Sequence, residues 1–150
     1  MVSGVNEQTF LQKAGMSDKV KKISDATTEY DCHGFTFLAG AEWINNGEVE
    51  KILKDNKYFV AQNPSVGDVV IYRDNKGLIQ HSGIVAAVSG NKVTRVISKW
   101  SVYGLYEHNL EDVPDSYGKK ITVYKSNRTS GNFPKGLGAG RPGNHLLRLR

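Results

Sequence analysis

Two residues of this 150-residue chain have the chemistry needed for nucleophilic catalysis. Cys32 is the single cysteine, and it follows Asp31, a residue type that caps helix N-termini. Unpaired N–H groups and the positive end of the helix dipole at such a position lower the pKa of a thiol. The main-chain N–H of Cys32 would also serve an oxyanion hole. His81 opens an apolar stretch, and its imidazole could take the thiol proton and later return it to a leaving group. The sequence therefore predicts a cysteine–histidine pair that is adjacent in space.

Such a pair needs a third, orienting group that fixes the histidine tautomer. A turn at residues 90–91 makes the numbers of paired residues in the flanking strands sum to 181, which places Trp100 opposite His81. Ser98 lies one diagonal away on the same face and is the polar candidate, with a main-chain carbonyl as the alternative. His108 is either a surface histidine or a third member of the site, if the segment before it folds back over the cleft.

The surrounding pattern predicts the elements that bring these residues together. Residues 7–23 carry apolar side chains near helical spacing and predict short helical pieces. A helix is expected after Asp31, with Phe35, Leu38 and Trp43 on one stripe, and a second helix over residues 48–57. Strands are expected over residues 68–73, 81–88, 93–98 and 121–124, separated by turn clusters. Helices followed by an antiparallel meander predict an α+β fold.

The composition excludes several classes of protein. Hydrophobic residues make up 39% and charged residues 23%, as in globular domains rather than disordered chains. One cysteine is too few for a disulfide framework, a Cys-rich zinc module or an iron–sulfur centre. Cys32, His33 and His81 lack the short spacings of a metal site, so no metal and no cofactor is expected. No apolar run approaches the roughly 20 residues of a membrane span, and the N-terminus lacks a signal-peptide core.

The basic charge is concentrated at one end of the chain. Residues 126–150 contain five basic residues and no acidic one, which accounts for the whole net charge of +5. This segment is rich in Gly and Pro and predicts a tail, leaving residues 1–125 as the domain. The tail lacks the interleaved aromatic residues of a nucleic-acid platform, so nucleic acid is not expected as a partner. A basic nucleic-acid-binding protein stays an alternative that steep salt dependence would reveal.

Three segments resemble a known family. Asp31-Cys32-His33-Gly34-Phe35 resembles the Asp-Cys-Ser-Gly-Phe signature of the NlpC-type, papain-like cysteine peptidases. The stretch over residues 63–72 resembles their Pro-x-x-Gly-Asp strand entry, and His81-Ser82-Gly83-Ile84-Val85 resembles their His-Val-Gly-Ile-Tyr strand. The order and the spacing agree over residues 30–98, close to half of the chain.

The resemblance implies a papain-like fold, in which N-terminal helices carry the nucleophile and pack on an antiparallel sheet. It implies cleavage of amide bonds by Cys32 with His81 as base, usually in peptide or peptidoglycan-like substrates. We take the substrate-side and oxyanion residues to be Asp31, His33, Gly34 and Trp100.

The chain also departs from the family pattern. His33 replaces the usual small Ser, and Val93 falls where a third polar group is usual. The continuation after residue 98 looks more like toxin-like modules at the ends of large bacterial proteins. Such a module would be secreted or delivered as an effector and would have a cognate inhibitor or immunity protein as partner. Related enzymes deamidate or transfer acyl groups with the same dyad. A catalytically silent binding module on the same scaffold is a further alternative.

Overall fold

The structure, a computed structural model, describes residues 4–126. In this part of the chain the helices are α1 (Gly4–Lys13), α2 (Cys32–Leu38), α3 (Asn46–Asp55) and a single-turn 3-10 helix, η1 (Asp115–Tyr117). The strands are β1 (Val20–Ser24), β2 (Phe59–Val60), β3 (Val69–Arg73), β4 (Ile79–Ser89), β5 (Lys92–Lys99), β6 (Leu105–His108) and β7 (Lys120–Lys125). The expected tail lies outside the described residues except for residue 126, so the domain boundary stays a prediction.

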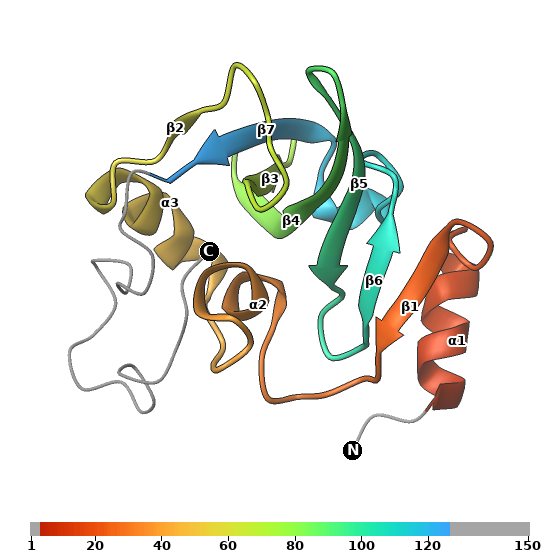
Figure 1. Cartoon of the computed structure of the whole chain (residues 1–150). Coiled ribbons are helices and arrows are strands. Elements are labelled where there is room, and N and C mark those ends of the chain that lie inside the picture. Colours follow the sequence, from red (N-terminus) through yellow and green to blue (C-terminus); the bar gives the residue numbers. More distant parts are fainter. Residues whose placement is uncertain (1–3, 127–150) are drawn as a thin grey trace.

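The described strands form one seven-stranded sheet in the order β1-β6-β5-β4-β3-β7-β2. Every pairing is antiparallel. Strands β3 to β6 form a meander, and β7 returns to pair with the other side of β3. Figure 1 shows α2 and α3 together on one side of the sheet, with α1 beside β1 and β6 at its far end. The α+β class with an antiparallel sheet is confirmed.

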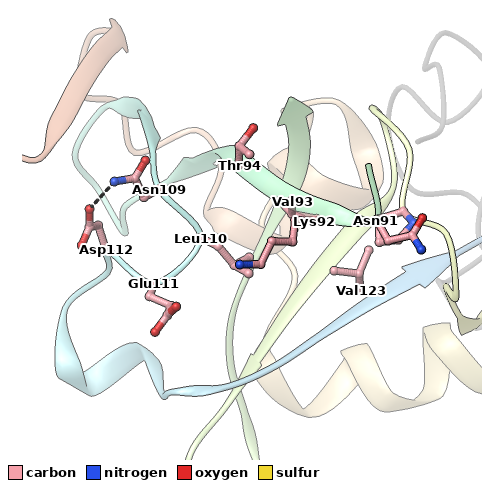
Figure 2. Close-up of a pocket in the computed structure, with 10 residues that line it drawn as sticks. Asn91, Lys92, Val93, Thr94, Asn109, Leu110, Glu111, Asp112 and Val123 are labelled. Carbon is pink, nitrogen blue, oxygen red and sulfur yellow. Dashed lines mark hydrogen bonds between the residues drawn. The ribbon is translucent and has the colours of Figure 1, made fainter. Parts of the chain in front are cut away.

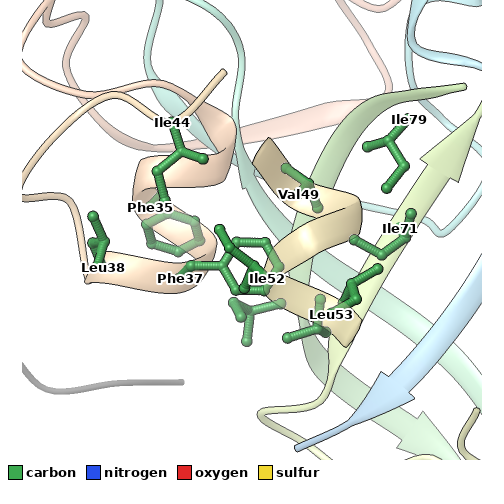
Figure 3. Packing of buried hydrophobic residues seen from close by; sticks show 11 residues of the cluster. Phe35, Phe37, Leu38, Ile44, Val49, Ile52, Leu53, Ile71 and Ile79 are labelled. Carbon is green, nitrogen blue, oxygen red and sulfur yellow. The ribbon is translucent and has the colours of Figure 1, made fainter. Parts of the chain in front are cut away.

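Both faces of the central strands are buried, which explains the continuous apolar run in β3. Val69 and Ile71 belong to a core cluster with residues of α2 and α3, part of which Figure 3 shows. Val70 and Tyr72 point to the opposite face and belong to a second cluster that includes Leu11 of α1. Alternate residues of a strand point to opposite faces, so neighbouring apolar residues serve different layers. Burial of each such side chain contributes about 1.5–3 kcal/mol.

The predicted register between β4 and β5 is confirmed at both ends of the pairing. Ser89 pairs with Lys92 next to the turn, and Ile84 pairs with Ile97 further along, so both pairs sum to 181. An irregularity near Ala87 shifts the register locally and is then compensated. The extrapolated register places His81 and Trp100 at the same end of the sheet.

Two predictions about the N-terminal half are wrong. The segment expected as helix up to residue 23 contains β1, whose Val20 pairs with His108 of β6. The helix after Asp31 does not extend to Trp43, because α2 ends at Leu38 and Ala39 adopts a left-handed φ of 53°. The second helix is confirmed over Asn46–Asp55, two residues earlier than expected.

Candidate functional site

Cys32 is the first residue of α2, and the predicted helix cap before it is confirmed. The Asp31 carboxylate accepts hydrogen bonds from the main-chain N–H of Gly34 at 2.8 Å and of Ile44 at 3.1 Å. Gly34 is required at this turn, because a Cβ there would lie 1.7 Å from the carbonyl oxygen of Glu42. Asp31 and Gly34, expected on the substrate side, thus fix the loop that presents the cysteine.

His81 lies on β4 opposite Tyr72 of β3 and is fully buried. Its ring stacks on Tyr117 with centroids 4.2 Å apart and an interplanar angle of 17°. The Tyr72 ring packs at a tilt, with centroids 5.2 Å apart. Within residues 4–126, neither ring nitrogen of His81 has a hydrogen-bond partner. Aromatic contacts, rather than a hydrogen-bonded third residue, therefore surround the imidazole.

Cys32 and His81 line the same cavity, as the sequence predicts. It measures about 170 Å³ and is also lined by Asp31, Trp43, Asn46, Gln80, Ser101 and Tyr117. The N-terminus of α2 supplies the thiol, and the start of β4 supplies the imidazole. Trp43 is 42% exposed and forms a wall of this cavity. A nucleophile and a base thus line one small pocket that is partly open to the surface.

The thiol is not pre-ionised, so the prediction of a lowered thiol pKa is wrong. Burial raises the pKa of Cys32 to about 12, and the neighbouring Asp31 carboxylate acts in the same direction. The main-chain N–H groups of Ser82, His33 and Cys32 favour the thiolate but do not outweigh these effects. Desolvation of the sulfur dominates over the helix N-terminus.

The imidazole is neutral as well. Burial lowers the pKa of His81 well below its ordinary value, and the nearby His108 and His33 act in the same direction. A neutral ring retains one nitrogen with a free lone pair, which is the form that accepts a proton. The resting site therefore holds a neutral thiol and a neutral imidazole in one cavity, not a thiolate–imidazolium ion pair.

Ser98 and Trp100 form a hydrogen-bonded cluster with His108 instead of contributing to the cavity lining. Ser98 Oγ lies 2.7 Å from His108 Nε2, and the Trp100 indole N–H donates to Ser98 Oγ at 2.9 Å. His108 Nδ1 lies 2.7 Å from the Asn109 carbonyl oxygen, so it carries the proton, and Nε2 accepts from Ser98. The three side chains are fully buried and do not line the cavity. His108 is thus no surface histidine, and Ser98 orients His108 instead of His81.

His33 belongs to a polar chain that reaches the cavity without lining it. Its Nε2 lies 2.7 Å from Asn46 Oδ1 and its Nδ1 lies 2.7 Å from Ser82 Oγ. Asn46 in turn donates to Gln80, and Gln80 donates to the Asp74 carboxylate at 3.0 Å. Because a carboxylate only accepts, this order places a proton on Nε2 of His33. His33, expected on the substrate side, is thus outside the cavity lining, whereas Asn46 and Gln80 of the same polar chain line the cavity.

Lys99 is a buried cation beside the site that the sequence analysis did not identify. The side chain is fully buried, and its ammonium donates to the carbonyls of Thr27, at 2.8 Å, and Ser101. It also lies 5.1 Å from the ring centroid of Tyr30. Burial lowers the pKa of Lys99 to about 8. This cation joins the loop before α2 to the turn that carries Ser101 into the cavity.

A larger surface hollow of about 650 Å³ lies elsewhere, and Figure 2 shows its lining side chains. It is formed by residues 91–94 at the start of β5 and by the segment over residues 109–112, with Pro64 and Val123. Asn109 donates to Asp112 at 3.0 Å within it. It shares no residue with the cysteine–histidine cavity and has neither a cysteine nor a histidine in its lining. We therefore assign no nucleophilic chemistry to this hollow, although it is the larger of the two.

The described residues have neither a metal-binding cluster nor a membrane-spanning helix. Over residues 4–126, no group of three or more His, Cys, Asp or Glu side chains is placed to hold a metal ion. No described helix has the length and apolar character that crossing a membrane requires.

The comparisons with known proteins define the family of this chain. The model of the family described as "Domain of unknown function (DUF7689)" matches residues 21–125, and the chain belongs to this family. The match runs from β1 to the end of β7 and includes Cys32 and His81. No curated protein and no solved structure matches the chain.

Proposed function

We propose that this protein is a cysteine-dependent hydrolase of amide bonds, with Cys32 as the nucleophile and His81 as the general base. The observation that carries the proposal is the shared cavity, in which the thiol lies with an imidazole that has no hydrogen-bond partner within residues 4–126. Buried polar groups without partners are uncommon, and at functional sites they await a ligand or a proton. An inert packing cysteine does not explain the unpartnered imidazole.

The neutral resting state sets the order of the chemical steps. As the Cys32 sulfur attacks the amide carbon, the S–H proton moves to His81, the S–C bond forms, and the carbonyl π electrons move onto oxygen. The His81 imidazolium then gives its proton to the leaving nitrogen, and the C–N bond breaks to leave a thioester. Water attacks the thioester with His81 as base, which releases the acid and regenerates the thiol. Proton transfer is coupled to attack because a free thiolate is disfavoured by burial.

A papain-like fold is the proposed finer description of the α+β domain. Its support is the chain order, in which a cysteine-bearing helix packs on a sheet whose later strand begins with the histidine. A peptide or peptidoglycan-like substrate follows from the same sequence resemblance. We also propose that the protein is delivered as an effector and has an inhibitor or immunity protein as its partner.

The test is product analysis with a panel of peptides and peptidoglycan stem fragments in ¹⁸O-labelled water. Hydrolysis yields a new carboxyl group with one ¹⁸O atom, acyl transfer yields an unlabelled adduct, and deamidation releases ammonia from a side-chain amide. We expect products with the parent protein and none with Cys32→Ala or His81→Gln. Turnover by folded Cys32→Ala contradicts the proposal.

A catalytically silent binding module is the second candidate, and the buried thiol favours it. Cys32 is only 8% exposed, and its raised pKa is typical of a packing cysteine. A silent module predicts that a bound peptide stays intact and that binding survives Cys32→Ala. The same panel, followed by isothermal titration, separates the two candidates.

A further inference from the structure

Tyr117 completes the wall of the cavity from a segment that sequence analysis did not connect to the site. It ends the single-turn helix η1, in which its N–H donates to the Pro114 carbonyl at 2.9 Å. The turn closes at Gly118, whose φ is 92° and whose N–H donates to the Asp115 carbonyl at 3.1 Å. A Cβ on Gly118 would lie 2.3 Å from the Arg73 carbonyl oxygen. This turn is therefore pressed against the end of β3 and delivers the tyrosine ring to His81.

The Tyr117 ring is the nearest stacked neighbour of the imidazole. The 4.2 Å centroid separation and 17° angle put the two rings face to face. Trp100 supports Tyr117 from another side in an edge-on contact at 6.0 Å. Because no described residue hydrogen-bonds to either nitrogen of His81, these ring contacts are what restricts the imidazole's tilt.

The phenol group is a second buried donor without a partner. Its oxygen is inaccessible to solvent and has no hydrogen-bond partner within residues 4–126. Burial raises the pKa of Tyr117 far above its ordinary value, and the proximity of Cys32 is the next largest cause. The phenol thus keeps its proton, and Tyr117 lines the same cavity as Cys32. An unsatisfied buried donor costs about 1–3 kcal/mol, a cost that an acceptor on a ligand would remove.

We propose that Tyr117 is a further catalytic residue of the site, whose phenol donates a hydrogen bond to the substrate carbonyl oxygen while its ring holds His81 in place. The inference rests on the proposed function of Cys32 and His81. As the S–C bond forms, the carbonyl oxygen gains the electron pair of the broken π bond and becomes a stronger acceptor. The phenol proton stays on Tyr117 throughout, so the step needs no further proton donor. Charge on that oxygen strengthens the hydrogen bond selectively in the transition state.

The test uses a probe that forms the tetrahedral adduct without turnover. N-acetyl-alaninal labelled with ¹³C at the aldehyde carbon adds to a thiol: the S–C bond forms and the thiol proton ends on the former carbonyl oxygen. Carbon NMR follows this adduct and gives its dissociation constant. Iodoacetamide alkylation of Cys32 is the matched readout, since no carbonyl carbon becomes tetrahedral in that reaction. The variants are Tyr117→Phe, which keeps the ring, and Tyr117→Leu, which removes it.

We expect Tyr117→Phe to lower the ratio of aldehyde affinity to alkylation rate at least about tenfold, the effect of one lost hydrogen bond to an adduct oxygen. Its melting temperature should be equal to or above that of the parent, because the change removes an unsatisfied buried hydroxyl. Tyr117→Leu should also slow the alkylation of Cys32, whereas Tyr117→Phe, which keeps the ring, should be alkylated at the rate of the parent. An unchanged ratio in Tyr117→Phe overturns the donor role, and equal alkylation rates in the Leu and Phe variants overturn the ring's role. If the parent forms no adduct, the Cys32–His81 assignment fails as well.

Discussion

Acid should destabilise this protein in a pH range where carboxylates do not yet titrate, because its buried histidines resist protonation. Burial lowers the pKa of His108 from 6.5 to about 4 in the folded state. Between these values the unfolded chain binds a proton that the native state does not, so stability falls as the pH decreases. From pH 6.5 to pH 5, this single group lowers the free energy of unfolding by about 1.5 kcal/mol. His81 contributes with the same sign, since its pKa is lowered well below 6.5.

Urea unfolding at a series of pH values measures this effect, with His108→Gln as the test variant. Gln removes the titrating group and can still accept the hydrogen bond from Ser98. We expect the loss of stability between pH 6.5 and pH 5 to be smaller by about 1.5 kcal/mol in His108→Gln than in the parent. Val96→Ala is the matched control, because Val96 is the fully buried strand partner of His108 and its loss lowers stability at every pH. A parent-like pH dependence in His108→Gln refutes the reasoning.

Substitutions at three further positions test the residues that hold the cavity in place, with stability measured by thermal or urea unfolding. Gly34→Ala places a Cβ 1.7 Å from the Glu42 carbonyl oxygen, so we expect the free energy of unfolding to fall by at least about 3 kcal/mol, or the protein not to fold. Stability equal to that of the parent would contradict this close approach. Asp31→Ala should cost about 1–2 kcal/mol through the lost helix cap, and Asp31→Asn, which can still accept, should cost less. Lys99→Met leaves two carbonyls, including that of Ser101, without their buried donor, and we expect a loss of about 1–3 kcal/mol. An unchanged unfolding midpoint in Lys99→Met would contradict the role of Lys99 in holding the cavity wall.

The parts of the site that the sequence predicts are those set by local rules. The Asp31 cap follows from residue type, and the β4–β5 register follows from a two-residue turn, so both could be derived before the structure. The convergence of Cys32 and His81 required the resemblance of three motifs in addition. Strand β1 was missed because only its end residues are part-buried, so its sequence has no alternating pattern.

The features of the site that the sequence does not predict depend on tertiary contacts, which no short sequence pattern encodes. Nothing near Tyr117 in the sequence indicates that its ring stacks on His81, 36 positions away, because the β3–β4 hairpin and η1 create that contact. The thiol pKa was predicted with the wrong sign for a related reason. The helix N-terminus is visible in the sequence, but the desolvation that outweighs it comes from the packing of α2 on β4 and β5.

The central claim is that His81 acts as a base toward the Cys32 thiol, and the pH dependence of Cys32 alkylation tests it most directly. With a thiol pKa of about 12, only about one thiol in 10⁵ is ionised at pH 7, so any appreciable rate there requires base assistance. His81 stays neutral down to mildly acidic pH, since its pKa is lowered. We predict a flat rate from about pH 5 to pH 8 in the parent and in His108→Gln, the buried-histidine control. His81→Gln should lose this plateau, with a rate at pH 7 lower by about 10²-fold. Equal rates in His81→Gln and the parent would contradict the account.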